Sequence, residues 1–152
     1  ESKSAIEIRT DKLLLRIEKA DGAIRFLNAD RTLLLSENKK EPRLVENGES
    51  WSFFDFEKKE KIKSKGILAT DLMDLSLKAR YISFGGKPMR MPFILSDKGY
   101  GIGVAAEKTA LFCNVSMYGQ YVYTDVTDQI DYYFLYGGSL GRTIELHNEL
   151  FG

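Results

Sequence analysis

The stretch PFILSDKGYGIGV, residues 92–104, sets an apolar run before a polar turn and three glycines at alternate positions. The segment 96–99, Ser-Asp-Lys-Gly, has the composition of a tight turn whose glycine adopts a left-handed backbone. Gly101 and Gly103 then share one face of the following strand, where another backbone or a large ring packs closely. The stretch therefore predicts a β-hairpin.

The same glycines also fit a dinucleotide-binding fingerprint, because residues 101–106 read G-x-G-x-x-A and Asp125 and Asp128 follow about 20 residues later. That fingerprint requires a helix that opens on the glycines and binds the pyrophosphate at its N-terminus. The chain instead becomes β-branched and aromatic by Phe112, and no strand–helix–strand alternation appears. The hairpin is the favoured interpretation.

Alternating apolar and polar residues continue through most of the chain, separated by turn residues such as Asp21-Gly22. Strands are predicted over residues 5–8, 12–18, 23–27, 32–35, 50–56, 75–84, 92–96, 101–107, 110–118, 120–126 and 130–137. The lysine-rich segment Glu57–Lys65 is expected to be a solvated hairpin or loop. Short, evenly spaced strands rich in aromatic and β-branched residues predict an all-β, antiparallel β-sandwich.

The last residues change to a helical period. Ser139 is a plausible N-cap, and one apolar face is predicted from Leu140, Ile144, His147 and either Leu150 or Phe151. His147 is expected to be a packed helix residue. The predicted organisation is a β-sandwich over residues 1–138 and one C-terminal helix over residues 139–152.

Composition excludes several classes of function. The 22 basic residues balance the 22 acidic ones, and no basic surface typical of nucleic-acid binding stands out. With one cysteine, Cys113, and one histidine, the chain lacks the residues of a Cys/His zinc site, and we expect no metal and no cofactor. No apolar run is long enough for a membrane span.

The segment PFILSDKGYGIGV, followed by IDYYFLYGGSLGRTIELHNELFG at 130–152, resembles the end of a known domain. It is similar to the N-terminal, galactose-mutarotase-like β-sandwich (supersandwich) of glycoside hydrolase family 31, which includes α-glucosidases and α-xylosidases. Residues 6–37 are similar to the same domain, so the resemblance covers about residues 5–152. The family usually has Pro, Tyr and Thr where this chain has Gly138, His147 and Phe151.

The resemblance implies a non-catalytic role for this chain. Retaining glycosidases need two carboxyl groups about 5 to 5.5 Å apart, and in the family both lie on a (β/α)8 barrel that follows the sandwich. The implied partners are that barrel, toward which the helix leads, and an α-glycoside. Relatives with this domain are often exported, so the resemblance implies a periplasmic or extracellular location after removal of a signal peptide. The residues themselves do not identify the compartment.

Two groups of residues are candidates for contact with sugar. In the family, the loop before the Pro-Phe strand reaches the substrate, and here it contains Phe84, Gly85, Gly86, Lys87, Met89 and Arg90. A stacking platform is the second candidate, with Trp51, Tyr118, Tyr121 and Tyr123. The simpler alternatives are a hairpin turn with solvated charges for the loop, and cross-strand packing pairs for the aromatic residues.

Three hypotheses for the whole chain therefore remain open. The first is the non-catalytic domain of an α-glycosidase, for which we expect an exposed apolar patch near the C-terminal helix. The second is a free-standing carbohydrate-binding sandwich, which requires aromatic side chains in a row on an exposed face. The third is a structural or interaction domain with neither feature.

Overall fold

The structure, a computed structural model, describes residues 4–65, 72–74, 79–83, 93–104, 109–115, 119–124 and 130–151. Strands β1 to β7 cover Ala5–Arg9, Leu13–Glu18, Ile24–Asn28, Leu33–Ser36, Arg43–Glu46, Glu49–Phe53 and Ile62–Lys65. Strands β8 to β14 cover Leu72–Asp74, Ala79–Ser83, Phe93–Ser96, Tyr100–Val104, Thr109–Val115, Gly119–Thr124 and Tyr132–Tyr136. Helix α1, Leu140–Phe151, follows the last strand.

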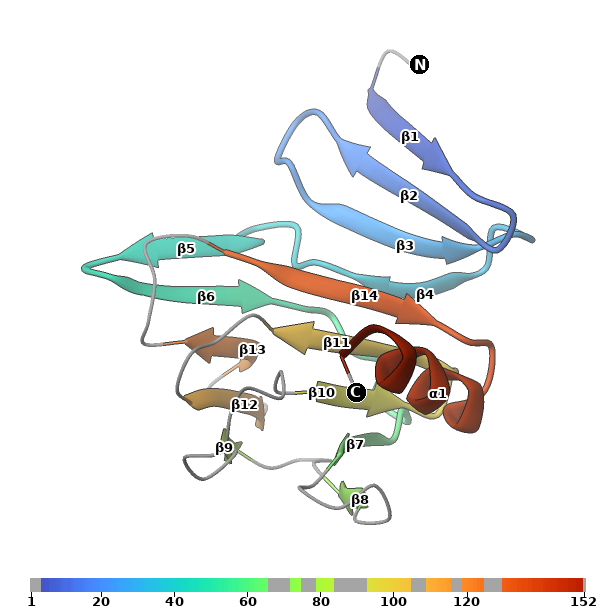
Figure 1. The fold of residues 1–152 in the computed structure, drawn as a ribbon. Helices are drawn as coiled ribbons and strands as arrows, with labels where there is room; N and C mark the ends of the chain where they lie inside the picture. The colour runs from blue at the N-terminus through green and yellow to red at the C-terminus, as the bar shows by residue number, and fades with distance from the viewer. Residues whose placement is uncertain are drawn as a thin grey trace.

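The strands form three antiparallel sheets in the described part of the chain (Figure 1), which confirms the all-β prediction. The N-terminal sheet has the order β1-β2-β3-β4, so each strand pairs with its neighbour in sequence. The helix-covered sheet has the order β14-β11-β10-β7-β8, and the outer sheet has the order β5-β6-β13-β12-β9. Backbone pairing of residues 36–38 with 53–55 joins the N-terminal sheet to the segment after β6.

The main core lies between these sheets. Its largest buried residues are Phe26, Leu34, Leu35, Phe54, Phe56, Ile62, Ile94, Tyr100, Ile102 and Phe112. Burying side chains of this size contributes about 1.5 to 3 kcal/mol each. Because members of this core come from all three sheets, the core holds the N-terminal sheet to the sandwich.

Helix α1 covers the opposite face of the helix-covered sheet, where a second cluster joins Phe93, Leu95 and Leu135 to Ile144 and Phe151. Strand β10 is therefore buried on both faces, which explains its uninterrupted apolar sequence. The Ser139 hydroxyl accepts a hydrogen bond from the Arg142 N–H at 3.3 Å, which confirms the predicted N-cap.

The hairpin predicted from residues 92–104 is present, with β10 paired to β11. Gly99 has a φ of 80° in the turn, and a Cβ there would collide with the backbone of Gly138. A Cβ at Gly101 would collide with the Phe93 ring, which is the close ring contact that the alternate glycines predicted. Both glycines belong to a strand pair rather than to a loop that opens a helix.

One detail of the sequence-based expectation was wrong. The Glu57–Lys65 segment is not a solvated loop throughout, because Ile62 and Ser64 are each 1% exposed on β7 and Glu60 is 8% exposed. Strand β7 pairs with β10 on one side and β8 on the other, despite the flanking lysines.

The predicted apolar face of α1 is confirmed. His147 is 3% exposed and packs on Phe93, and Ile144 and Phe151 contact the sheet. Of the two alternatives for the last position, Phe151 is the packed one, since Leu150 is 60% exposed.

Candidate functional site

The N-terminal sheet has one aliphatic face, formed by residues that face each other across its registers. These residues are Ile6, Ile8, Leu13, Leu15, Ile17, Ile24, Phe26 and Leu35. In one row across the sheet, Leu35 is 1% exposed, Phe26 is 3% exposed, Leu15 is half-buried and Ile8 is 52% exposed. The aliphatic face is thus closed at β4 and open at β1.

The closed end is packed against β14. The Phe26 ring stacks on Phe134 with centroids 4.0 Å apart and meets Tyr132 edge-on at 6.3 Å. Beside this contact, a groove of about 430 Å³ is lined by Leu13, Leu15, Ile24, Phe26, Arg43 and residues 130–134. The groove continues the open aliphatic face to the edge strand of the helix-covered sheet.

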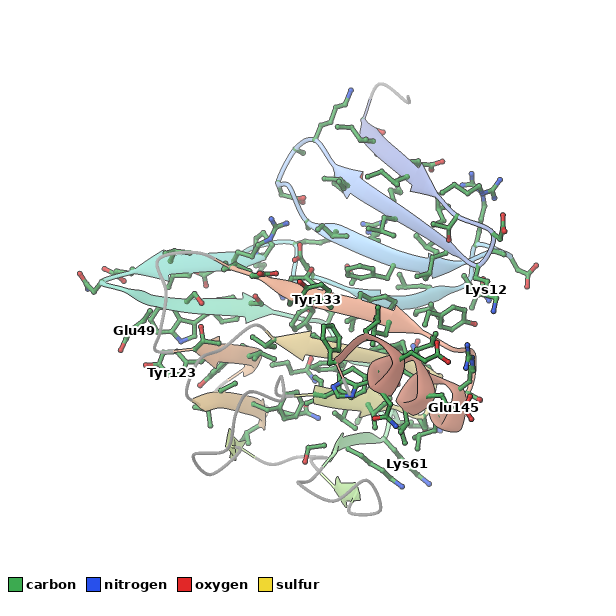
Figure 2. The ribbon with its side chains drawn as sticks, in the orientation of Figure 1. Lys12, Glu49, Lys61, Tyr123, Tyr133 and Glu145 are labelled. Atoms are coloured by element: carbon green, nitrogen blue, oxygen red, sulfur yellow. The ribbon has the colours of Figure 1, made fainter. Side chains whose placement is uncertain are left out.

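Tyr133 and α1 extend this apolar region. Tyr133 is 43% exposed and contacts Phe151 edge-on, with ring centroids 5.2 Å apart. Figure 2 shows Tyr133 on β14, with the N-terminal sheet on one side and α1 on the other. Exposed apolar side chains beside the C-terminal helix are thus Tyr133 and, on the helix itself, Leu150, which is 60% exposed.

The reverse face of the N-terminal sheet is charged. Arg16 forms ion pairs with Glu7 at 3.6 Å and Glu18 at 2.9 Å, and Arg25 approaches Glu18 at 3.4 Å. These pairs are only partly exposed, and they share the face with Leu14, which is 1% exposed. The two faces of one sheet thus differ in the chemistry of their exposed side chains.

A buried carboxylate, Glu37, fixes the closed end of the sheet. Its side chain is 0% exposed and accepts hydrogen bonds from the Ile24 N–H at 2.8 Å, from Arg43 at 2.7 Å and from the Tyr132 hydroxyl at 2.6 Å. Burial, together with the Glu37 charge, raises the pKa of Tyr132 far above its ordinary value of 10.0. Tyr132 therefore stays a neutral donor to Glu37 at all ordinary pH values.

A second buried carboxylate, Glu60, has the same kind of partner. It accepts hydrogen bonds from the Tyr100 hydroxyl and from the Ser96 hydroxyl, the latter at 2.5 Å. Burial and the Glu60 charge likewise raise the pKa of Tyr100 well above 10.0. Lys98 lies 3.8 Å from Glu60 and donates to the Leu34 carbonyl at 3.2 Å, which adds a contact to the N-terminal sheet.

The aromatic candidates on β6 and β13 lie on the outward face of the outer sheet. Trp51 faces Tyr123 with ring centroids 5.2 Å apart, and Phe53 faces Tyr121 at 5.7 Å. The Tyr123 hydroxyl donates to Glu49 at 2.9 Å, and both side chains are labelled in Figure 2. These half-buried residues are cross-strand pairs, the simpler of the two interpretations, and their outer surfaces still form a row.

The other predicted site residues lie outside the described residues. They are Tyr118 of the aromatic set and the whole loop set of Phe84, Gly85, Gly86, Lys87, Met89 and Arg90.

The sequence analysis did not identify the aliphatic face or the two buried glutamates. The sequence indicates an apolar sheet face through alternate apolar positions at Ile6, Ile8, Leu13, Leu15 and Ile17. Only the structure shows that the β1 end of this face is left exposed by the described residues. A glutamate within a polar segment carries no comparable signal, because its burial depends on partners such as Tyr132 that are distant in sequence.

Within the described ranges, no helix is long and apolar enough to cross a membrane. The same ranges contain no group of three or more His, Cys, Asp or Glu residues placed to hold a metal ion.

Sequence comparison gave no match to a family model and none to a curated protein. Solved structures do match. A glycoside hydrolase family 31 dextranase from Flavobacterium johnsoniae, complexed with glucose, has a TM-score of 0.83 and 22% identity over 100% of this chain. A cycloalternan-forming enzyme from Listeria monocytogenes, in complex with a pentasaccharide substrate, has a TM-score of 0.71 and 19% identity over 90% of the chain. A family 31 α-xylosidase from a soil metagenome, complexed with xylose, has a TM-score of 0.66 and 19% identity over 90% of the chain.

These matches cover only a small part of the relatives. The chain spans 20% of the dextranase, 15% of the cycloalternan-forming enzyme and 24% of the α-xylosidase. The chain thus has the fold of a part of the family 31 dextranase over its whole length, and of a part of the family 31 α-xylosidase over 90% of its length.

Proposed function

We propose that this chain is the non-catalytic, N-terminal domain of a retaining α-glycosidase of glycoside hydrolase family 31 and packs on its catalytic barrel. The observation that carries the proposal is the coverage of the match: all of this chain corresponds to about a fifth of a family 31 dextranase. The two-part organisation, a sandwich over 1–138 and a helix over 139–152 that leads toward the barrel, belongs to this proposal.

The open aliphatic face supports the proposal because it suits a protein partner better than water. On this face Ile6 is 38% exposed and Ile8 is 52% exposed, and Tyr133 on the neighbouring strand β14 is 43% exposed, whereas the arginines and glutamates of the reverse face pair with one another. Protein interfaces of stable complexes have an apolar centre of this kind with a polar rim. We assign this face to contact with the remainder of a longer chain, since the solved relatives are several-fold longer.

The proposal also includes contact between the candidate loop and the substrate. Lys87 and Arg90 would donate hydrogen bonds to sugar hydroxyls, and Phe84 or Met89 would present an apolar surface, with Gly85 and Gly86 allowing the turn. The substrate class that the family resemblance implies is an α-glycoside, with an α-glucoside or α-xyloside as the first to test.

The test uses the protein encoded by the complete gene. We expect it to hydrolyse p-nitrophenyl α-glucoside or α-xyloside with retention, whereas the 152-residue chain alone hydrolyses neither. Replacing the two carboxylates of the barrel should abolish hydrolysis without changing the stability of the domain. Hydrolysis by the isolated chain, or a complete gene product that lacks a barrel, would refute the proposal.

A second candidate function is a free-standing carbohydrate-binding module. The aromatic row of Trp51, Phe53, Tyr121 and Tyr123 favours it, because the C–H face of a sugar packs well on aromatic rings. Trp51→Ala should then weaken binding of an oligosaccharide to the isolated chain by about tenfold, and unchanged binding would exclude this surface.

A further inference from the structure

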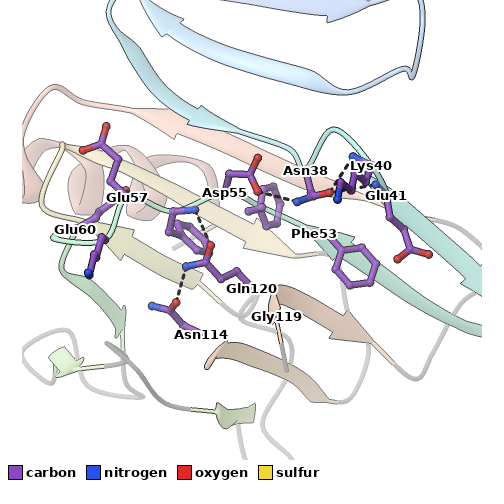
Figure 3. Close-up of a pocket in the computed structure, with 13 residues that line it drawn as sticks. Asn38, Lys40, Glu41, Phe53, Asp55, Glu57, Glu60, Asn114, Gly119 and Gln120 are labelled. Atoms are coloured by element: carbon purple, nitrogen blue, oxygen red, sulfur yellow. Dashed lines mark hydrogen bonds between the residues drawn. The ribbon is translucent and has the colours of Figure 1, made fainter. Parts of the chain in front are cut away.

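The groove drawn in Figure 3 lies where the end of β6 meets the start of β13 and has a volume of about 630 Å³. Its polar side chains bond to one another, because Asn38 donates to Asp55 at 2.8 Å and Gln120 donates to Asn114 at 2.8 Å. Since these groups pair within the chain, we assign no ligand to the groove. Backbone groups without a described partner lie instead at the outer edge of β1.

Strand β1 is an edge strand of the N-terminal sheet, and Figure 1 shows it on the outer side of that sheet, away from the other two. Its register with β2 fixes which backbone groups point outward. The Thr10 N–H donates to the Leu13 carbonyl at 2.8 Å across this register, so the even-numbered residues of β1 bond to β2. Glu7 and Arg9 therefore point their N–H and C=O groups away from β2, and no described strand pairs with them.

This edge lacks the features that usually prevent a strand from pairing with another chain, which are proline, a bulge or a covering segment. Strand β1 contains no proline, its register with β2 is regular over all five residues, and no described element covers it. The opposite edge of the same sheet is protected. There the β3–β4 register shifts between Phe26 and Leu27, and residues 53–55 pair beside β4.

The sequence of β1 makes it complementary to a second copy of itself. In an antiparallel pair with a two-fold axis at Ile8, Glu7 of each copy lies directly opposite Arg9 of the other. Both residues point their backbone groups outward, so each such pair exchanges both of its N–H···O bonds. Opposite charges in this position stabilise a strand pair by about 0.2 to 1 kcal/mol, whereas an axis at Glu7 would place like charges opposite each other.

The side chain on the axis is apolar. Ile8 is 52% exposed in the single chain. In this pairing it meets Ile8 of the other copy at a non-hydrogen-bonded position, where side chains approach most closely. The dimer would therefore cover the most exposed residue of the aliphatic face.

The charged residues on the reverse face are ready for this contact. Arg9 is exposed, and no described carboxylate forms an ion pair with it. Glu7 is held on this face by Arg16 at 3.6 Å and by Arg31 at 3.2 Å, and its side chain is still 31% exposed. Arg9 would thus gain an ion pair that the single chain does not give it.

Strand β5, the edge strand of the outer sheet, does not have this complementarity. Two-fold registers that pair three of its residues place Arg43 opposite Val45 or Leu44 opposite Glu46. Arg43 is also bound to Glu37 at 2.7 Å. We propose that the chain forms a two-fold dimer in which the β1 strands of two copies pair antiparallel around Ile8 and join the two N-terminal sheets into one.

This dimer goes beyond the proposed domain role and does not depend on it, because it uses the backbone edge of β1 and is measured on the 152-residue chain alone. Pairing of one short strand gives a small interface, so we expect a Kd on the order of 100 µM. Sedimentation velocity measures it over concentrations from about one tenth to about ten times this Kd. We expect a concentration-dependent change from monomer to dimer.

Arg9→Glu is the decisive variant. It places carboxylates opposite each other on both sides of the axis and should weaken dimerisation by about tenfold. Arg9→Lys keeps the charge and should dimerise like the parent. Glu46→Lys, a charge reversal on the β5 edge, is the matched control and should also dimerise like the parent. Because Arg9 has no ion pair within the described chain, neither of its variants should change the thermal unfolding of the monomer.

Cysteine crosslinking tests the register. Ile8→Cys brings two sulfur atoms together across the axis, within reach of a disulfide. Ile6→Cys, on the same face of β1, leaves its two sulfur atoms about 13 Å apart along the strands. Cys113 is buried and does not compete for this reaction. Under mild oxidation we expect Ile8→Cys to form a disulfide-linked dimer and Ile6→Cys to remain monomeric.

Three results would overturn the proposal. A monomer at every concentration would leave the edge of β1 to another strand of the complete protein. Equal dimerisation of Arg9→Glu and Arg9→Lys would exclude the ion pairs. Crosslinking of Ile6→Cys as readily as Ile8→Cys would indicate association through the aliphatic face without pairing of β1. None of these results bears on hydrolysis by the complete protein.

Discussion

Phe26 and Ile8 lie in the same row of one sheet face, two strands apart, and have opposite environments. Phe26 is 3% exposed beneath Phe134 and Tyr132, whereas Ile8 is 52% exposed. Both follow the same apolar alternation, so the pattern of the sheet does not distinguish them. What stands opposite each side chain decides its burial, and opposite Ile8 the described chain supplies nothing.

The largest expected effect breaks the closed end of this row. Phe26→Ala removes a ring that stacks on Phe134 at 4.0 Å and should lower the free energy of unfolding by about 3 to 5 kcal/mol. Ile8→Ala, in the same row, should cost less than about 1 kcal/mol because half of the side chain is already in water. Urea denaturation measures the free energy of unfolding of both variants. Equal losses would contradict the conclusion that Phe26 is packed and Ile8 is not.

A somewhat smaller loss is expected when the buried carboxylate of the closed end is removed. Glu37→Ala leaves Tyr132, Arg43 and the Ile24 N–H without their common acceptor, which should cost about 3 kcal/mol. Glu46→Ala, an exposed glutamate on β5, is the control and should stay within about 0.5 kcal/mol of the parent. If both variants unfold at the same urea concentration, Glu37 does not fix the sheet.

Alkaline pH tests the two buried tyrosines. The raised pKa values of Tyr100 and Tyr132 mean that the unfolded chain loses these protons above about pH 10 while the folded chain keeps them. Stability is therefore intact below pH 10 and falls above it, by about 1.4 kcal/mol per tyrosine between pH 9 and pH 11. Tyr132→Phe should remove half of this tyrosine-linked fall, as measured by thermal unfolding across this pH range. If the stability of Tyr132→Phe falls between pH 9 and pH 11 as steeply as that of the parent, Tyr132 must ionise in the folded protein.

The smallest expected effect on the stability of the isolated chain is at the exposed β1 end of the aliphatic face. Ile8→Lys should change the stability of the 152-residue chain by no more than about 0.5 kcal/mol, since the side chain can extend into water. In the complete protein, the same change would bury a charge at the proposed contact with the barrel and lower both stability and hydrolysis. Arg9→Ala, on the same strand but on the reverse face, is the control. Full stability of the complete protein with Ile8→Lys would exclude this face as the contact.

Much of the architecture could be predicted because it depends on local signals. Three such signals are the glycines at 99 and 101, the N-cap at Ser139 and the short apolar-rich segments of residues 5–36. Each acts over a few residues, and the structure contains the predicted turn, cap and strands. The burial of Ile62 and Ser64 could not be predicted, because the neighbouring lysines indicate a solvated segment. Pairing with β10, about 30 residues away, overrides that local signal.

The candidate sites divide in the same way. The row of Trp51, Tyr121 and Tyr123 follows from alternate positions on adjacent strands, and the structure places these residues in cross-strand pairs. The buried carboxylate of Glu37 was not foreseen, because its partners Ile24, Arg43 and Tyr132 lie on three separate strands. No spacing in the sequence encodes such a set of partners.

The strand order of the N-terminal sheet also has a consequence for folding. All its pairings join consecutive strands, whereas the helix-covered sheet must bring β14 beside β11 and β7 beside β10. Local pairings form faster than distant ones, and the N-terminal part of a chain leaves the ribosome first. The four-stranded meander can therefore form early, with its aliphatic face bare, and Tyr132 reaches Glu37 only after another 95 residues of chain have been made.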